Sequence, residues 1–248
     1  MELVERIERA TLAAVSPQQV QEMPGWLLPM DPGTVGRAHS AAPTSHAPPD
    51  RGVLDAVAAR YRASGWKPVL RLPDLAAWQP LHSELLSKGW GRSKPVCVMT
   101  ASVATVCERT VGPMPAGVQV MLQNQASARW TGLFLGEGLD PVDGASRSQA
   151  LARSRETRFA GVMLDDTMVA CGAACYCCSL FSAHGLRTAL EYRGRGFATA
   201  MLGVMARSAQ QQGIAEAFLQ VEAGNRARAL YERLGFSLAW EYSYWKQV

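Results

Sequence analysis

Residues 191–201 read EYRGRGFATAM, so two arginines and two glycines fill the four positions 193–196. A β-rich segment, residues 181–190, precedes this stretch, and an apolar pattern of helical period runs from Phe197 to a stop at Gly213. The first turn of a helix leaves backbone N–H groups unpaired, and the helix dipole adds partial positive charge there. Because glycine lets the backbone come close to a ligand, this strand, turn and helix predict a site for a phosphate or pyrophosphate.

Two common phosphate-binding motifs do not fit these residues. A P-loop requires Gly-Lys followed by Ser or Thr, and the sequence contains no such tripeptide. The dinucleotide-binding motif GxGxxG would use Gly194 and Gly196, but Thr199 stands at its third glycine position. Taken alone, the stretch is also compatible with a tight turn whose arginines are solvated.

A second segment of the sequence helps to identify which phosphate-containing ligand the turn could bind. Arg193, Gly196 and Ala198 match the [Q/R]xxGx[G/A] motif of the GCN5-related N-acetyltransferase superfamily, and VEAGNRARALYERLGF, residues 221–236, resembles its strand, asparagine, helix, tyrosine and Leu-Gly-Phe segment. The resemblance covers about residue 118 to the C-terminus and is strongest over 185–236. It implies an acyl-CoA N-acyltransferase fold, acetyl-CoA as cosubstrate and transfer of acetyl to a primary amine.

The resemblance also implies where acetyl-CoA would bind. The pyrophosphate would accept hydrogen bonds from the turn at 194–199, and the pantetheine amides would lie beside 186–188 if the strand at 217–223 diverges. A backbone N–H near Thr188 or Leu190 would polarise the thioester carbonyl. The expected cofactor-binding residues are Leu186, Arg187, Thr188, Arg193, Gly194, Arg195, Gly196, Phe197, Ala198, Thr199 and Asn225.

Tyr231 matches the superfamily's general acid, which would protonate the departing thiolate; a core aromatic is the alternative role. Asn225 either orients this region or only caps the following helix. The acceptor ammonium must lose a proton, at a cost of about 4–5 kcal/mol at pH 7.

Some members of the superfamily carry a glutamate base where this sequence has Gln220. Glu222 faces the same side of the strand and is the first candidate base, ahead of Glu191 and His184. Each of these three residues could instead be solvated or structural.

Hydrophobic periodicity and turn residues predict an α+β protein. The resemblance implies that its strands form a mixed, mainly antiparallel central sheet flanked by helices. We expect helices at about 50–64, 75–88, 197–213 and 226–234, with one or two more between 126 and 155. Strands are expected at 66–73, 94–103, 118–122, 181–190, 217–223 and 237–245, and a hairpin at 158–164 and 167–178. Asp50, Asp74 and Asn225 are expected to cap helices.

The order helix, glycine, strand, helix, glycine, aromatic occurs twice, around Gly65 and Gly89 and again around Gly213 and Gly235. We therefore expect a degenerate, acetyltransferase-like supporting half at 1–110 and a catalytic domain at 111–248. Leu85 stands where the second copy has Tyr231, and 50–56 offers only Arg51 and Gly52 beside two aspartates. The first half would support the fold or shape the acceptor site, which residues 25–43 could approach.

The 248 residues carry a net charge of +4 with scattered basic residues, which argues against a nucleic-acid partner. The first residues lack signal-peptide features, and the uncharged run at 167–186 is interrupted by polar residues and glycine, so no membrane segment is expected. Without an export signal, the six cysteines are expected to be reduced thiols in the cytoplasm. Their spacing does not match a zinc site, so no metal is expected.

The sequence thus predicts an N-acetyltransferase in which the amine attacks acetyl-CoA directly in a ternary complex. The alternative is a non-catalytic acyl-CoA binding or sensing module, which Gln220 favours and Tyr231 opposes. The acceptor would be a small-molecule or peptide amine, and the protein a monomer or homodimer.

Overall fold

The computed structural model describes residues 1–50, 52–93, 95–113, 116–136, 138 and 140–247. Its α-helices are α1 (Leu3–Val15), α2 (Val53–Ala63), α3 (Gln79–Ser87), α4 (Val103–Arg109), α5 (Ala128–Phe134), α6 (Pro141–Arg153), α7 (Phe197–Gln211) and α8 (Arg228–Arg233). Short 3-10 helices are η1 (Gly36–Ala38), η2 (Ala76–Trp78) and η3 (Leu190–Tyr192). The strands are β1 (Gln19–Met23), β2 (Trp26–Met30), β3 (Ala42–Pro43), β4 (Val69–Pro73), β5 (Trp90–Arg92), β6 (Val96–Ser102), β7 (Val118–Gln123), β8 (Thr157–Leu164), β9 (Thr167–Cys177), β10 (Leu180–Thr188), β11 (Glu216–Glu222) and β12 (Ser237–Gln247).

In this part of the chain, nine strands form one sheet in the order β4-β12-β6-β11-β10-β9-β8-β7, with β5 also paired to β12. The neighbouring strands are antiparallel, except that β10 and β11 run parallel. Strands β1, β2 and β3 form a separate three-stranded sheet. The predicted α+β class with a mainly antiparallel central sheet is confirmed.

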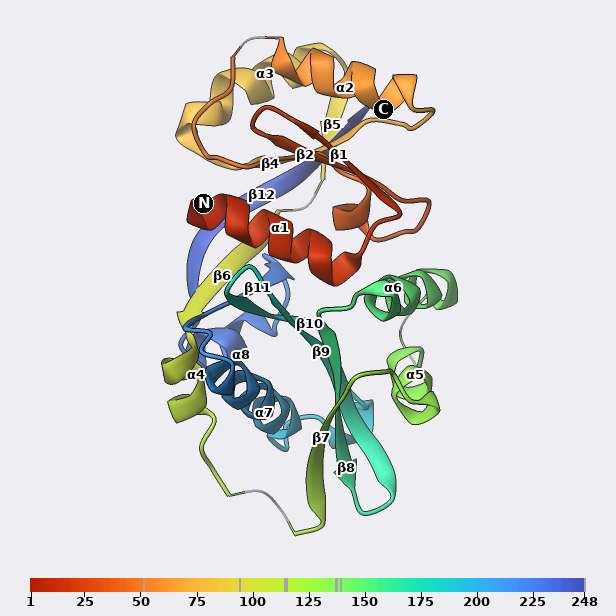
Figure 1. The fold of residues 1–248 in the computed structure, drawn as a ribbon, viewed down its shortest axis with the longest axis vertical. Coiled ribbons are helices and arrows are strands. Elements are labelled where there is room, and N and C mark those ends of the chain that lie inside the picture. Colours follow the sequence, from red (N-terminus) through yellow and green to blue (C-terminus); the bar gives the residue numbers. More distant parts are fainter. Residues whose placement is uncertain (51, 94, 114–115, 137, 139, 248) are drawn as a thin grey trace.

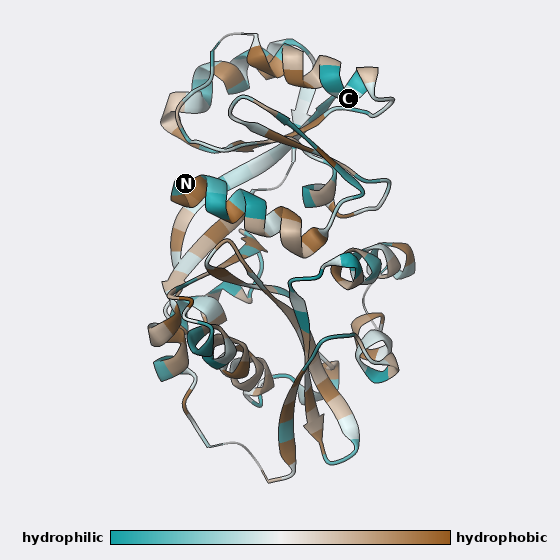
Figure 2. Ribbon diagram, viewed as in Figure 1, coloured by the Kyte–Doolittle hydropathy of each residue, from teal (hydrophilic) through white to brown (hydrophobic). Residues whose placement is uncertain are grey.

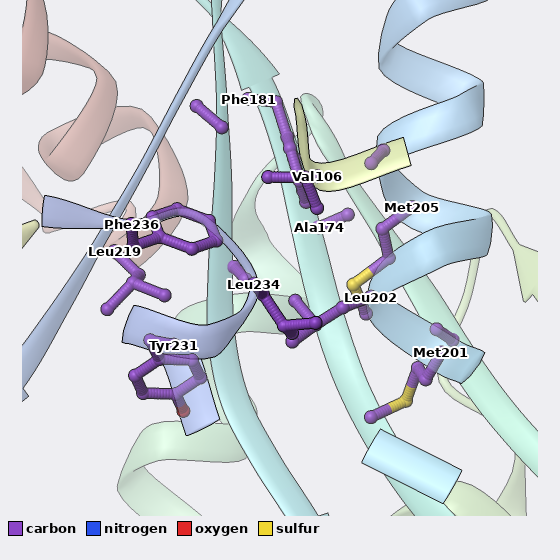
Figure 3. Packing of buried hydrophobic residues seen from close by; sticks show 14 of the residues in the cluster. Val106, Ala174, Phe181, Met201, Leu202, Met205, Leu219, Tyr231, Leu234 and Phe236 are labelled. Carbon is purple, nitrogen blue, oxygen red and sulfur yellow. The ribbon is translucent and has the colours of Figure 1, made fainter. Parts of the chain in front are cut away.

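Helices cover both faces of the large sheet (Figure 1). Helix α7 packs on β8, β9 and β10 with α4 beside it, whereas α1 and α5 lie against the other face. Along β11 the side chains alternate between these layers: Leu219 joins the core under α7, and Phe218 joins the core under α1. Figure 3 shows Met201, Leu202 and Met205 within the first of these cores.

Helix α1 is amphipathic, with hydrophilic and hydrophobic residues around its axis (Figure 2). Ile7 and Ala10 are buried against the sheet. Glu8 lies on the buried side as well, where its carboxylate forms an ion pair with Arg71 of β4. Because α1 touches β9, β10 and α6 and also bonds to β4, it ties the first half of the chain to the second.

Strands from the two halves of the chain are interleaved in the large sheet. Strand β6 lies between β11 and β12, and β12 then continues past β6 to pair with β4 and β5 (Figure 1). The expected boundary at residue 110 falls directly after α4, so β6 and α4 precede it in the chain but pack with second-half elements. The division into two halves at that residue stays a prediction.

A similar order of elements occurs in each half. The parallel pair β10 and β11 flanks α7 in sequence, and β11 is followed in the sheet by β6 and β12. In the first half, a parallel bridge joins Ala41 to Leu70 around α2, and β4 is followed by β12 and β5. The glycines that end the helices, Gly65 and Gly213, both have positive φ. The order of elements that the sequence repeats therefore recurs in the fold, and the duplication itself stays a prediction.

Most predicted elements are present, but the predicted helix caps at Asp50, Asp74 and Asn225 are wrong. Helix α2 begins after Gly52, and Asp50 only accepts a bond from the Val53 N–H through its backbone oxygen, at 3.3 Å. Asp74 lies well before α3, because η2 intervenes, and its carboxylate binds Arg92 instead. Arg51, and the Lys94 at which a strand was expected to begin, lie outside the described residues.

Candidate active site

Strands β10 and β11 pair over only part of their length. The parallel ladder joins Leu180–Ala183 to Glu216–Leu219, and β10 then has an irregular register on β9 between His184 and Arg187. Gly185 lies at this irregularity with φ 58°, and a Cβ there would come within 2.7 Å of the Phe134 ring. Only glycine fits both constraints, so Gly185 permits the bend by which β10 leaves β11.

The bend exposes one backbone edge of β10. The N–H of Ala189 donates to the carbonyl oxygen of Val169 at 3.0 Å, so Ala189 faces β9. Backbone groups alternate in direction along a strand, and the N–H of Thr188 therefore faces the gap between β10 and β11. The Thr188 carbonyl accepts a bond from Arg193 Nε at 3.2 Å. A backbone donor thus lies where the resemblance places the thioester and pantetheine amides.

The glycine–arginine turn connects η3 to α7. Gly194 and Gly196 have φ of 78° and 83°, which side-chain-bearing residues seldom adopt. A Cβ at either position would meet no atom within 4 Å, so the space beside them is open. The hydrogen bond from Ala200 N–H to Gly196 C=O starts the helical ladder, so the amides of residues 197–199 precede it. This is the geometry of an anion-binding helix start.

The two arginines of the turn contact backbone carbonyl groups and an aromatic ring. Arg193 bonds only to the Thr188 carbonyl, and Arg195 bonds to the Glu191 carbonyl at 3.2 Å while its Cζ lies 5.3 Å from the centre of the Tyr192 ring. Within the described residues neither guanidinium forms an ion pair. Next to them is a cleft of about 370 Å³, lined among others by Arg195, Gly196, Thr199 and Arg207.

Three other expected cofactor residues have additional roles. Phe197 borders the same cleft, but its side chain is buried in the core under α7. Ala198 is half-buried in the first turn of α7. Arg187 donates to the Gly136 carbonyl at 2.7 Å, so its side chain reaches towards the segment after α5.

A second cleft, of about 580 Å³, lies between the first and second halves. The second half contributes Gly185, Leu186, Gln220, Val221, Glu222, Asn225 and Tyr231, together with Arg147 and the β12 residues Tyr242, Tyr244 and Lys246. The first half contributes Val35, Gly36, Arg37, His39, Val69, Ser93 and Val96. The structure therefore brings the expected general acid, the first candidate base and the bent part of β10 together in one cleft.

Tyr231 has the features of a proton donor. Its side chain is 8% exposed and packs against Phe236, with ring centres 6.2 Å apart. Figure 3 shows the hydroxyl on the side of the ring away from Phe236. Burial raises the pKa of the phenol, so Tyr231 stays protonated at neutral pH.

Asn225 shapes the segment that carries Tyr231. Its Oδ1 accepts a bond from the Ala227 N–H at 2.9 Å, and α8 begins only at Arg228. The predicted cap at Asn225 is therefore wrong: the N-cap of α8 is Ala227, which has no side-chain cap bond, and residues 225–228 form a turn closed by the Arg228 N–H and the Asn225 carbonyl. Asn225 also lines the cleft that contains Tyr231.

The candidate bases differ in their surroundings. Glu222 is exposed at the end of β11 and lines the same cleft as Tyr231. His184 is buried with its Nε2 at 2.7 Å from Ser182 Oγ, and burial, with the charge of Arg37, lowers its pKa to about 3. An imidazole with that pKa is a poor proton acceptor at neutral pH. Glu191 borders a different cleft, near Thr188 and Arg193.

Gln220 is the centre of a hydrogen-bond network. Its Nε2 donates to Thr11 Oγ1 at 2.7 Å, and its Oε1 accepts bonds from Tyr242 and Arg37 at 2.8 and 3.3 Å. The contribution of Arg37 was not foreseen, although residues 25–43 were expected to approach the acceptor. No local motif marks this arginine, because its position depends on the contact between halves.

Residues 3–245 match the family described as "Probable histone acetyltransferase Rv0428c C-terminal". The chain belongs to this family. The matched residues span both halves of the chain, so they include β6 and β12, the strands that connect the two halves in one sheet. No curated protein matches the sequence.

Solved structures share the fold of this family member. A GCN5-related N-acetyltransferase from Kribbella flavida is 16% identical, with a TM-score of 0.71 over 100% of this chain and 96% of its own. A tandem GNAT protein from the clavulanic acid biosynthesis pathway is 12% identical, with a TM-score of 0.62 over 98% and 93%. These likenesses establish the GCN5-related N-acetyltransferase fold.

Across the part of the chain that the structure describes, no group of three or more His, Cys, Asp or Glu side chains is arranged to hold a metal ion. In the same residues no helix combines the length and apolar character needed to span a bilayer.

Proposed function

We propose that this protein is an N-acetyltransferase that transfers acetyl from acetyl-CoA to a primary amine. The observation that carries the proposal is the bend of β10 away from β11 directly before an open glycine–arginine helix start. Coenzyme A has a pyrophosphate and an amide-bearing arm, and these two features fit those two sites. The acetyltransferase family and fold support the same reaction class.

The residues support direct transfer in a ternary complex. The amine nitrogen would bond to the acetyl carbon, with the N–H of Thr188 stabilising negative charge on the carbonyl oxygen. As the carbon–sulfur bond breaks, Tyr231 would give its proton to the thiolate, and Glu222 would take the proton released by the amine. Tyr231 and Glu222 line one cleft, which gives both groups access to a common reacting centre.

The competing proposal is a non-catalytic module that binds or senses acyl-CoA. Gln220 favours it, because a neutral amide cannot serve as a base at that strand position. Glu222 and the buried, protonated Tyr231 favour turnover. The family's description adds a histone lysine to the acceptors to be tested, beside other small-molecule or peptide amines.

Release of free thiol from acetyl-CoA with a panel of amines separates these proposals. For the enzyme we expect amine-dependent release of free thiol from acetyl-CoA. Binding of coenzyme A, with no thiol release in the presence of any amine tested, would support the non-catalytic module. The described cysteines are all free thiols, which supports a proposed cytoplasmic location. We further propose a monomer or homodimer with no nucleic-acid or membrane partner.

A further inference from the structure

Positively charged side chains gather in the cleft that contains Tyr231. Arg37 from η1, Arg147 from α6 and Lys246 from β12 line this cleft, and Glu222 contributes a negative charge. Arg147 is paired with Asp143 at 2.6 Å. Within the described residues Arg37 and Lys246 form no ion pair, and the Glu8 carboxylate, which feels the charge of Arg37, is paired with Arg71.

Arg37 is the more enclosed of these two groups. It is half-buried, and its one hydrogen bond among the described residues joins Nη1 to Gln220 Oε1 at 3.3 Å. A guanidinium has five N–H donors in a planar fork, so most of its donors remain for a ligand. The two buried carboxylates of the first half form ion pairs with arginines other than Arg37. Glu8 binds Arg71, and Asp31 binds Arg153.

Gln220 holds Arg37 in place without cancelling its charge. The Gln220 amide is itself fixed by Tyr242 and Thr11. A glutamate at this position would neutralise the guanidinium, whereas the amide oxygen accepts its hydrogen bond and stays uncharged. Because residue 220 is glutamine and not glutamate, Arg37 remains a positioned cation in the cleft that Val221 and Glu222 also line.

We propose that the acceptor is a small amine that also carries a carboxylate or phosphate, and that Arg37 binds this anionic group. The inference rests on the proposed acetyl transfer and names its substrate class. A carboxylate or phosphate matches the guanidinium fork, with Lys246 adding positive charge. A peptide rich in Lys and Arg would be repelled.

The test compares acceptors that differ by one anionic group. The first pair is 4-aminobutanoate and 4-aminobutanamide, in which a methylene chain keeps the amine pKa nearly the same; the second pair is phosphoethanolamine and ethanolamine. We expect kcat/KM to be about 10- to 100-fold higher for the anionic member of at least one pair, the usual value of a charged hydrogen bond. The pair that shows the preference identifies carboxylate or phosphate as the recognised group.

Arg37→Gln should lower kcat/KM for the anionic acceptor by a similar factor, mainly through KM, and leave its uncharged partner unchanged. Arg37→Lys should restore part of the loss. Arg60→Gln is the matched control, because Arg60 is exposed on α2 and outside the cleft. Calorimetry with 4-aminobutanoate and phosphoethanolamine on the coenzyme A-loaded protein reads the same contact without turnover.

The outcomes separate this inference from the proposed function. Acetylation with no anionic preference, or a preference for a Lys- and Arg-rich peptide, would overturn the acceptor class and leave acetyl transfer standing. Arg37-dependent anion binding without acetylation of any amine would overturn the enzyme and retain Arg37 as an anion site. An equal loss for charged and uncharged acceptors in Arg37→Gln would make Arg37 structural and overturn the inference.

Discussion

Gly52 and Gly196 occupy equivalent positions in the two halves, because each directly precedes a helix and has a positive φ, of 86° and 83°. At both glycines the space that a Cβ atom would face is open. Their neighbours differ in charge. Gly196 and Arg195 both line the cleft at α7, whereas the start of α2 has Asp50 before it and an exposed Asp55 in its first turn. The same backbone geometry is thus present twice, and Arg51 precedes Gly52 in the sequence as Arg195 precedes Gly196, but the two aspartates that would repel a pyrophosphate accompany only the first copy.

Coenzyme A is therefore expected to bind once per chain, at α7. Gly196→Val should abolish binding, because the side chain would occupy the space beside the first helical amides. Gly52→Val imposes comparable backbone strain, of about 1–2 kcal/mol, and should leave the affinity unchanged. Calorimetry on the folded variants measures both. A second site of similar affinity would contradict the assignment, as would loss of binding in Gly52→Val alone.

Tyr231→Phe should lower turnover by roughly 10²- to 10⁴-fold while retaining coenzyme A affinity, because it removes the proton donor and keeps the ring that packs on Phe236. Steady-state kinetics and calorimetry provide the two measurements. Turnover close to that of the unsubstituted protein would assign Tyr231 to the core only.

The pH dependence follows from the same phenol. Its pKa lies above the usual value of about 10, and the protonated form is the active one, so activity limited by this donor should persist beyond pH 10 and fall only as the phenol ionises. A pH–rate profile of kcat measures this alkaline limb. The limb should disappear in Tyr231→Phe, and an alkaline limb centred well below pH 10 in the unsubstituted protein would point to another group.

Glu222→Gln should reduce kcat more than it changes coenzyme A affinity, since the amide cannot accept the proton of the amine. The expected loss is about 10²-fold or more. Glu191→Gln is the matched control, because Glu191 borders a different cleft. Equal losses in the two variants, or none in Glu222→Gln, would remove Glu222 from the mechanism.

Removing one member of the buried pair of Glu8 and Arg71 should destabilise the protein more than removing one member of an exposed pair. Glu8→Ala leaves a guanidinium that is 2% exposed without its carboxylate, a change that costs about 3–5 kcal/mol. Glu84→Ala breaks an exposed pair with Lys88 and should cost under about 1 kcal/mol. Denaturant unfolding compares the two variants, and equal costs would contradict the expectation.

Local features were readable from the sequence. The apolar repeat of α7, its stop at Gly213 and the hairpin of β8 and β9 depend on neighbouring residues, and the structure confirms them. The cap at Asp50 was wrong because Gly52, two residues later, supplies the turn. The insertion of β6 beside β11 and the placement of Arg37 beside Gln220 could not be predicted, because the paired residues are more than a hundred positions apart and no local pattern specifies their partners.

The path of β12 has a consequence for how the protein is made. This strand follows every other strand in the chain, yet it completes the pairing of β6 in one half and of β4 and β5 in the other. During synthesis neither half can finish its sheet before residues 237–247 have left the ribosome, so β4 and β6 must wait with an unpaired edge. Folding therefore closes both halves in one late step, and stalling translation upstream of β12 would leave an aggregation-prone chain in place of a folded first half.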